Sequence, residues 1–172
     1  MKKNNFLILL LITIFFVNAC KKDVIDTIKK VDPGKSSTYP LNGEYWVQLD
    51  AAPIATPIAW SNALGYKKII ISNTSTDKGD SIWIDDLKNI WQFKVKTACS
   101  PALMTFNVTD GKERYNDDAT TIKNGKLILD KGITKGGNKT DSIYMEISWA
   151  SDSANVYRLS GVRRTGFTED EY

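Results

Sequence analysis

The sequence predicts an all-β domain, an eight-stranded up-and-down antiparallel barrel. Apolar and polar residues alternate with a period of two in eight short segments, and turn-forming residues separate these segments. No stretch has the longer apolar period of a helix. Because each segment has one clearly apolar face, eight antiparallel strands close most simply around a single interior. An open two-layer sandwich is the alternative.

The expected strands follow one another within residues 39–172. They cover residues 43–50, 66–74, 80–86, 90–97, 103–109, 125–129, 141–149 and 155–164. Turn formers such as Asp110-Gly111 and Gly136-Gly137-Asn138 lie between them. The long connection between the first two strands is AAPIATPIAWSNALG, residues 51–65, which suggests a lid over the barrel mouth or a docking loop.

The more apolar face of each strand gives the predicted interior. It consists of Tyr45, Val47 and Leu49; Ile69 and Ile71; Ile82 and Ile84; Trp91, Phe93 and Val95; Met104, Phe106 and Val108; Leu127 and Leu129; Ile143, Met145, Ile147 and Trp149; Tyr157 and Leu159. The opposite faces carry polar residues such as Lys94 and Glu146, as expected where one face of a sheet meets water.

An export signal is expected before the domain. Lys2 and Lys3 precede an apolar run of 12 residues, Phe6 to Val17, which is too short for a bilayer core that needs about 20. The sequence Val17-Asn18-Ala19-Cys20 resembles the lipobox of bacterial lipoproteins, whose cysteine is acylated and becomes the new N-terminus. The resemblance implies a signal peptide over residues 1–19 and lipidation of Cys20. A plain secretory signal with an incidental cysteine is the alternative.

Acylated Cys20 implies a membrane as partner. Two acyl chains are enough for a stable anchor, because each buried methylene contributes about 0.8 kcal/mol. Lys21 and Lys22, rather than an aspartate, follow the cysteine, which favours the outer membrane with a periplasmic or surface-facing domain. Residues 20–38 are expected to form the acylated cysteine and a flexible tether, and residues 39–172 the barrel domain.

Composition excludes several classes of function. The chain has 23 basic and 20 acidic residues; without Lys2 and Lys3, 21 against 20 leaves a charge of +1, and no basic cluster predicts nucleic-acid binding. The absence of histidine excludes Ser-His-Asp and Cys-His catalysis and histidine-based zinc sites. No metal or other cofactor is expected.

The remaining candidates for catalysis are acidic pairs and one thiol. They are Asp85-Asp86, Asp117-Asp118 and Cys99. Adjacent acids on a strand point to opposite faces and acids in a loop are solvated, while a cysteine with no neighbouring base is interpreted as an inert thiol. The residues therefore favour a protein that is not an enzyme.

Several stretches resemble one family. They are LNGEYWV (41–47), IWQFKVKT (90–97) and residues 141–172, of which RRTGFTEDEY is the most specific. This resemblance, over most of residues 41–172, is to Bacteroidota lipoproteins described as lipid-binding putative hydrolases, and it implies a lipocalin-like (calycin) barrel. A histidine often precedes the two arginines in that family, where this chain has Val162.

Two non-enzymatic functions are compatible with the sequence. In the first, the barrel binds a lipid or other apolar small molecule through Tyr45, Trp91, Phe93, Phe106, Met145, Trp149 and Tyr157. In the second, these side chains only fill the barrel, and a protein or glycan partner contacts the outward residues Trp46, Trp60, Trp83 and Tyr144. The family resemblance favours the first, and its label adds lipid or ester hydrolysis as a third possibility.

Strand parity places Arg163 at the closure of the barrel. If the last strand pairs antiparallel with the first, Arg163 lies beside Tyr45. Lipocalins resemble this arrangement, with an arginine stacked on the aromatic residue of a Gly-x-Trp opening, whereas Gly43-Glu44-Tyr45 has tyrosine there.

Overall fold

The alternating segments form eight β-strands in the computed structural model, which describes residues 35–55 and 57–172. The strands are β1 (Gly43–Pro53), β2 (Ser61–Asn73), β3 (Ser81–Asp85), β4 (Lys94–Ser100), β5 (Thr105–Lys112), β6 (Ala119–Ile133), β7 (Lys139–Trp149) and β8 (Asn155–Arg163). Two short 3-10 helices, η1 (Ala150–Asp152) and η2 (Thr168–Asp170), follow β7 and β8. The predicted signal peptide and Cys20 lie outside the described residues.

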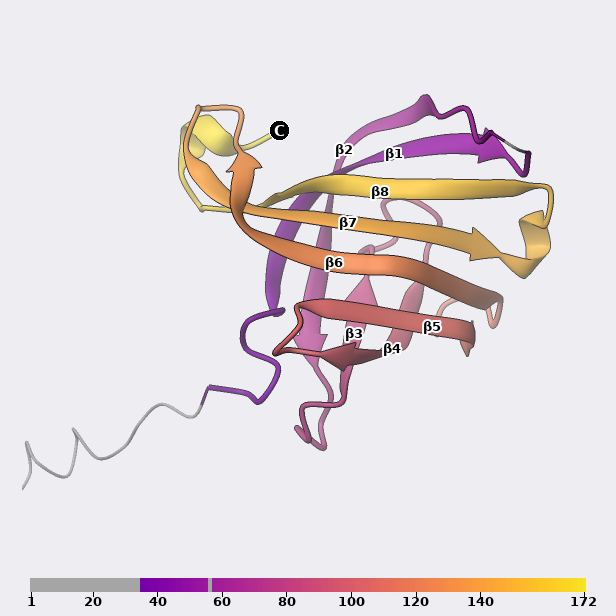
Figure 1. Ribbon diagram of the computed structural model, residues 1–172, viewed down its shortest axis with the longest axis horizontal. Helices are drawn as coiled ribbons and strands as arrows, with labels where there is room; N and C mark the ends of the chain where they lie inside the picture. Colours follow the sequence, from indigo (N-terminus) through magenta and orange to yellow (C-terminus); the bar gives the residue numbers. More distant parts are fainter. Residues whose placement is uncertain (1–34, 56) are drawn as a thin grey trace, which may run out of the picture. The chain divides into compact units, whose positions relative to one another are not determined.

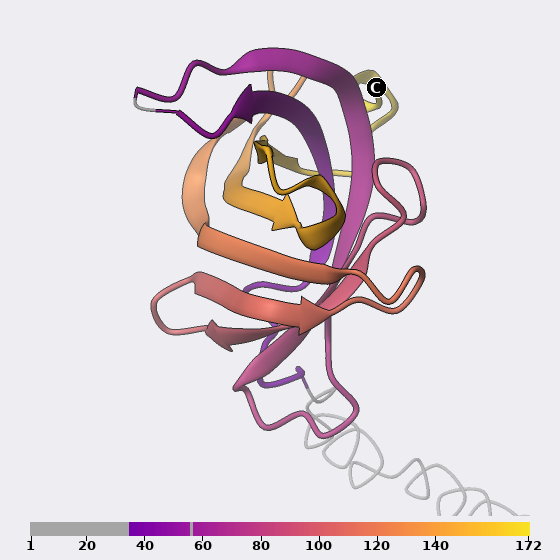
Figure 2. The same cartoon turned by 90° about the vertical axis from the view of Figure 1, so that its right-hand side faces the viewer.

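Each strand pairs antiparallel with the next, and β8 pairs with β1 to close the barrel (Figure 2). The up-and-down barrel predicted from the sequence is therefore confirmed, and the open sandwich is excluded. Gly161 permits the closing contact, because a Cβ there would lie 1.9 Å from the carbonyl oxygen of Trp46 on β1. No helix within residues 35–55 and 57–172 has the length and apolar character needed to cross a membrane.

The barrel has two different ends, which we call the base and the mouth. The base carries residues 36–42, the connections β2–β3, β4–β5 and β6–β7, and the C-terminal segment. The mouth carries the connections β1–β2, β3–β4, β5–β6 and β7–β8. In Figure 1 the β6–β7 hairpin and the C-terminus mark the base at the left, and the β7–β8 connection marks the mouth at the right.

The predicted inward faces form most of the core. Their fully or almost fully buried members are Tyr45, Val47, Leu49, Ile69, Ile71, Ile82, Ile84, Phe93, Val95, Phe106, Leu127, Ile143, Met145, Ile147, Trp149, Tyr157 and Leu159. Ile122 also belongs to the core, although it lies on β6 before the start of the predicted strand. Leu41 joins them from the segment before β1. Residues 36–38, which the sequence assigns to the tether, are bonded to the base, where Ser37 Oγ donates to the carbonyl oxygen of Asp77 at 2.6 Å.

One inward prediction is wrong, and one inward residue lies outside its expected strand. Leu129 is 51% exposed, because irregular pairing between Ile128 and Gly132 turns this part of β6 out of register with β7. Met104 packs against the core as predicted, but it lies in a turn before β5 with a φ of 55° and not on the expected strand.

The first hairpin is longer than predicted. Pairing between β1 and β2 reaches Ala51 and Ser61, and pairing between β1 and β8 reaches Pro53. Only residues 54–60 of the predicted 51–65 connection therefore lie outside strands. The alanines and prolines of this segment are weak strand formers, so its pairing depends on the neighbouring strands.

Candidate functional site

Aromatic side chains gather at the mouth, and we call Trp91, Phe93, Trp149 and Tyr157 the mouth cluster. Trp91 stacks on Trp149 with ring centroids 4.7 Å apart and an interplanar angle of 15°. Tyr157 and Phe93 lie tilted against Trp149 at 5.0 and 5.8 Å. Trp91 is half-buried, whereas the other three are buried. The indole of Trp91 therefore covers an otherwise enclosed aromatic group.

Asp86 shapes the loop that carries Trp91. Its carboxylate is 0% exposed and accepts hydrogen bonds from the backbone N–H groups of Lys88, Ile90, Trp91, Gln92 and Phe93 at 2.8 to 3.1 Å. The chain winds around this carboxylate, with positive φ values at Leu87, Lys88 and Gln92. The expected strand over residues 90–97 therefore begins only at Lys94, and Asp86 is a structural residue and not a solvated acid.

Two further acids hold neighbouring parts of the mouth. Asp85 forms an ion pair with Lys94 at 2.9 Å and accepts a hydrogen bond from the Tyr115 hydroxyl. Burial alone would raise the pKa of Asp85, but these donors and the Leu87 N–H lower it below its usual value. Glu113 is buried and accepts backbone hydrogen bonds from Lys94, Tyr115 and Asn116.

Among the described residues, four buried side-chain polar atoms lack a hydrogen-bond partner, and two of them lie in the interior near the mouth. These atoms are Trp46 Nε1, Thr97 Oγ1, Thr120 Oγ1 and Trp149 Nε1. Thr120 and Trp149 are directly opposite each other in the β6–β7 ladder. Buried polar atoms normally have a partner, so this pair requires an explanation.

The seven predicted ligand-binding residues do not line one open cavity. Four form the mouth cluster, while Phe106 and Tyr45 lie toward the base. Tyr45, Phe93 and Met145 have no exposed surface, and Phe106 and Trp149 each have 1%. Other side chains of the protein surround these residues, so an acyl chain would enter only if some of them moved.

Arg163 lies at the base over Tyr45, its register partner on β1. Its Cζ is 5.1 Å from the centre of the Tyr45 ring. Its Nε donates to Asp141 at 2.9 Å and its Nη2 to the carbonyl of Pro40 at 2.8 Å. The Tyr45 hydroxyl donates to the carbonyl of Leu41 at 2.7 Å, and burial raises the tyrosine's pKa. The observed register is the one that strand parity predicts.

Residues 30–168 match the family described as "Lipid-binding putative hydrolase". The chain belongs to this family. A structure of unknown function from Bacteroides ovatus, solved at 2.40 Å, is similar with a TM-score of 0.49 and 15% sequence identity. The similarity covers 77% of this chain and 44% of that one, so this chain spans less than half of that protein. A search of curated proteins gave no match.

Family membership and the barrel support a lipid-binding role. The residues considered for hydrolysis, Cys99, Asp117 and Asp118, lie in different surroundings. Burial raises the pKa of the Cys99 thiol, and Asp80 raises it further. Asp117 pairs with Lys112 on the surface, and Asp118 accepts a hydrogen bond from the Ser151 hydroxyl at 2.5 Å. No group of three acidic or cysteine side chains in the described part of the chain is arranged to hold a metal ion.

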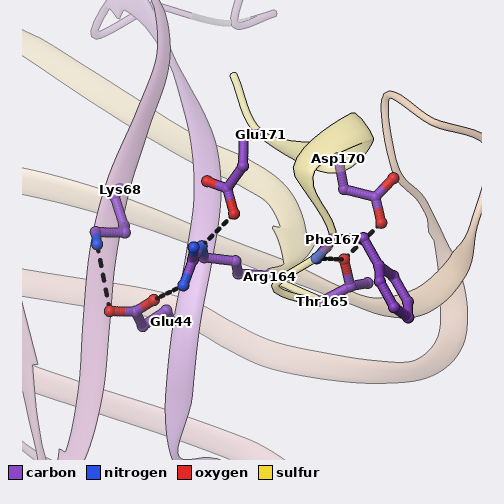
Figure 3. A network of polar contacts seen from close by, with 7 residues as sticks. All are labelled: Glu44, Lys68, Arg164, Thr165, Phe167, Asp170 and Glu171. Atoms are coloured by element: carbon purple, nitrogen blue, oxygen red, sulfur yellow. Dashed lines mark hydrogen bonds and ion pairs between the residues drawn. The ribbon is translucent and has the colours of Figure 1, made fainter.

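The C-terminal segment is fastened to the outside of the barrel near the base. Figure 3 shows Arg164 between Glu44 and Glu171, with Lys68 also bonded to Glu44. Asp170 is buried and accepts hydrogen bonds from Thr165, from Thr134 and Asn138 of the β6–β7 hairpin, and from the N–H of Gly136. The residues that carry the most specific resemblance to the family thus fasten the C-terminus to two other parts of the base.

Each outward aromatic residue predicted to meet a partner already contacts this chain. Trp46 lies 5.8 Å from Tyr172, and cations lie over the other three rings: Arg158 over Trp60, Arg114 over Trp83 and Lys126 over Tyr144. One groove of about 530 Å³ remains beside Tyr144, lined also by Asn107, Asn124, Lys126 and Glu146.

Proposed function

We propose that this protein is a membrane-anchored lipoprotein whose barrel binds a lipid or another apolar small molecule without catalysing a reaction. One observation carries the proposal: the half-buried Trp91 stacks on Trp149 at the mouth, over an apolar interior. An aromatic entrance to an apolar core suits an acyl chain or a flat apolar molecule. Membership of the family supports the same role.

Binding requires that the mouth opens. Because the interior side chains are buried, a ligand gains contact with them only when Trp91 swings away from Trp149. The loop backbone is held by Asp86, so rotation of the Trp91 side chain is the smaller change. The affinity is then reduced by the fraction of molecules that are closed.

The absence of catalysis is supported by the state of the candidate groups. The chain contains no histidine. Asp86 and Glu113 are occupied by backbone N–H groups, and the pKa of Cys99 is raised and not lowered. Turnover of a p-nitrophenyl ester by the purified protein, abolished by Cys99→Ser or Asp85→Asn, would instead support the hydrolase function.

The anchoring is supported by the lipobox resemblance at Val17–Cys20 and by the apolar surface at the base, where Tyr39, Leu103 and Leu129 are exposed. Cys20→Ser should block acylation, so the protein should appear unprocessed or in the soluble fraction after cell fractionation. A variant that is processed and sediments with membranes like the wild type would contradict the lipoprotein assignment.

Ligand binding is tested with residues 21–172, which contain the whole barrel. Organic extraction followed by mass spectrometry should identify a co-purified apolar molecule. Alkyl ligands of increasing length should then change tryptophan fluorescence with rising affinity, because each buried methylene contributes about 0.8 kcal/mol until the space is full. An empty extract and unchanged fluorescence at every length would refute the carrier function.

The groove beside Tyr144 favours a second candidate, binding of a glycan partner. An aromatic ring, two amides and a carboxylate border the groove on the outer face of β5 to β7. Binding to a glycan array that is lost in Tyr144→Ala but kept in Trp91→Ala would support this function.

A further inference from the structure

Thr120 and Trp149 form an unsatisfied polar pair inside the barrel. They are directly opposite each other on β6 and β7 and are 0% and 1% exposed. Neither Thr120 Oγ1 nor Trp149 Nε1 has a hydrogen-bond partner among the described residues. Leaving both groups unpaired in the core costs stability, so a function that uses them would explain why they are there.

We infer that this pair binds a neutral oxygen acceptor of the ligand, such as the carbonyl of an ester or a ketone. The indole N–H can only donate, whereas the threonine hydroxyl donates or accepts. A carbonyl oxygen has two lone pairs and can accept from both groups at once. The inference rests on the proposed function, and it adds the chemical class of the ligand.

The surroundings of the pair favour a neutral acceptor over an ionised carboxylate. The Tyr157 hydroxyl donates to Asp152, and the Tyr157 ring lies 5.0 Å from that of Trp149. On the neighbouring connection, Ser151 donates to Asp118 from both its N–H and its hydroxyl. A ligand carboxylate on Trp149 Nε1 would therefore lie near two like charges, which disfavours it.

The aromatic rings of the mouth cluster are weaker acceptors than a ligand oxygen. An N–H over an aromatic face gains less than an N–H bonded to a carbonyl. Trp91 stacks on Trp149 and keeps the pair from solvent. A ligand that displaces the Trp91 indole would replace its stacking and also supply the missing acceptor.

The test compares three probes of equal carbon number on residues 21–172: 2-nonanone, nonanoate at pH 8 and nonane. We expect 2-nonanone to bind most tightly in a fluorescence titration. Thr120→Val should weaken its binding about fivefold, as for loss of one neutral hydrogen bond, and leave nonane unchanged. Trp149→Phe keeps an aromatic ring but removes the N–H. It should weaken binding of 2-nonanone by a similar factor and leave binding of nonane unchanged.

Thr97→Val is the matched control. Thr97 also has a buried, unpartnered hydroxyl, but it lies on β4 opposite Ile82 of β3. The Thr97→Val variant should bind 2-nonanone, nonanoate and nonane with the affinities of the wild type. Thr120→Val should also leave the melting temperature unchanged or higher, because it removes an unpaired polar group, whereas loss of a structural hydrogen bond would lower it.

Trp91→Ala completes the test because it removes the side chain that covers the pair. It should bind 2-nonanone more tightly than the wild type, since the ligand no longer displaces the indole. Equal binding of 2-nonanone by wild type, Thr120→Val and Trp149→Phe would overturn the inference while leaving the carrier function intact. Tighter binding of nonanoate would overturn the preference for a neutral group. Failure of every probe to bind both wild type and Trp91→Ala would refute the proposed function itself.

Discussion

The Arg163 contact at the base and the Trp149 cluster at the mouth differ in how their buried polar groups are bonded. At the base, Arg163 bonds to Asp141 and two carbonyls, and Tyr45 bonds to Leu41. At the mouth, Asp86 is fully bonded, but Trp149 and Thr120 present a donor and a hydroxyl with no partner. A satisfied polar network stabilises a fold, whereas unsatisfied groups beside a movable aromatic cover suit a ligand. The base therefore serves stability, and the mouth is where function is expected.

The largest expected effect tests whether the mouth loop is rigid. Asp86→Ala leaves five backbone N–H groups without their acceptor and should lower the free energy of unfolding by about 4 kcal/mol, measured by urea denaturation. Asp117→Ala, at a carboxylate that is 76% exposed, should change it by less than about 0.5 kcal/mol. Equal effects of the two substitutions would show that Asp86 does not organise the loop.

The next effect tests the closure at the base. Arg163→Ala leaves Asp141 without its ion-pair partner and removes the cation over Tyr45, so the free energy of unfolding should fall by about 3 kcal/mol. Arg163→Lys should recover only part of this loss, because an ammonium lacks the planar fork that bonds three partners.

Arg164→Ala is the matched control for Arg163. Its ion pairs with Glu44 and Glu171 are about one third exposed and are screened by solvent. The thermal midpoint of the Arg164→Ala variant should therefore lie closer to that of the wild type than the midpoint of Arg163→Ala does. The reverse order would show that the base is held by the C-terminal segment and not by the Arg163 contact.

The smallest effect concerns Tyr157 of the mouth cluster. Burial, together with the hydrogen bond to Asp152, raises the pKa of Tyr157 from 10.0 to about 12. Because folding raises this pKa, the contribution is present below pH 10 and is lost as the pH rises toward 12. Tyr157→Phe should cost about 1 kcal/mol at pH 8, and the difference from wild type should shrink above pH 10 in urea denaturation. A difference that stays constant to pH 12 would contradict this.

Much of the fold could be predicted because its signal is local. Alternation of side chains identifies a strand and its inward face, so Tyr157, Leu159 and Arg163 share a parity that places Arg163 beside Tyr45. The predicted boundaries failed where tertiary pairing extends a weak strand, as in residues 51–53, or where pairing becomes irregular, as at Leu129. Neither the extended pairing of a weak strand nor the irregular pairing produces a repeating pattern in the sequence.

The candidate site was only partly predictable. Seven aromatic and apolar residues were assigned to it from parity, and the structure brings four of them together at the mouth. Thr120 was missed because the expected strand began only at residue 125, whereas β6 begins at Ala119. Thr120 becomes a candidate only because it lies opposite Trp149 and because neither side chain has a hydrogen-bond partner among the described residues.

The sequence by itself determined that this chain forms an antiparallel barrel, which faces its strands turn inward and which arginine closes it. Those properties follow from a two-residue period that each segment carries on its own. Only the tertiary structure decided that Asp86 winds residues 87–93 into a loop, that Trp91 covers Trp149, and that the donors of Thr120 and Trp149 remain unpaired. These features depend on which groups from distant segments meet in the enclosed core, where each hydrogen bond made or missing changes the free energy most.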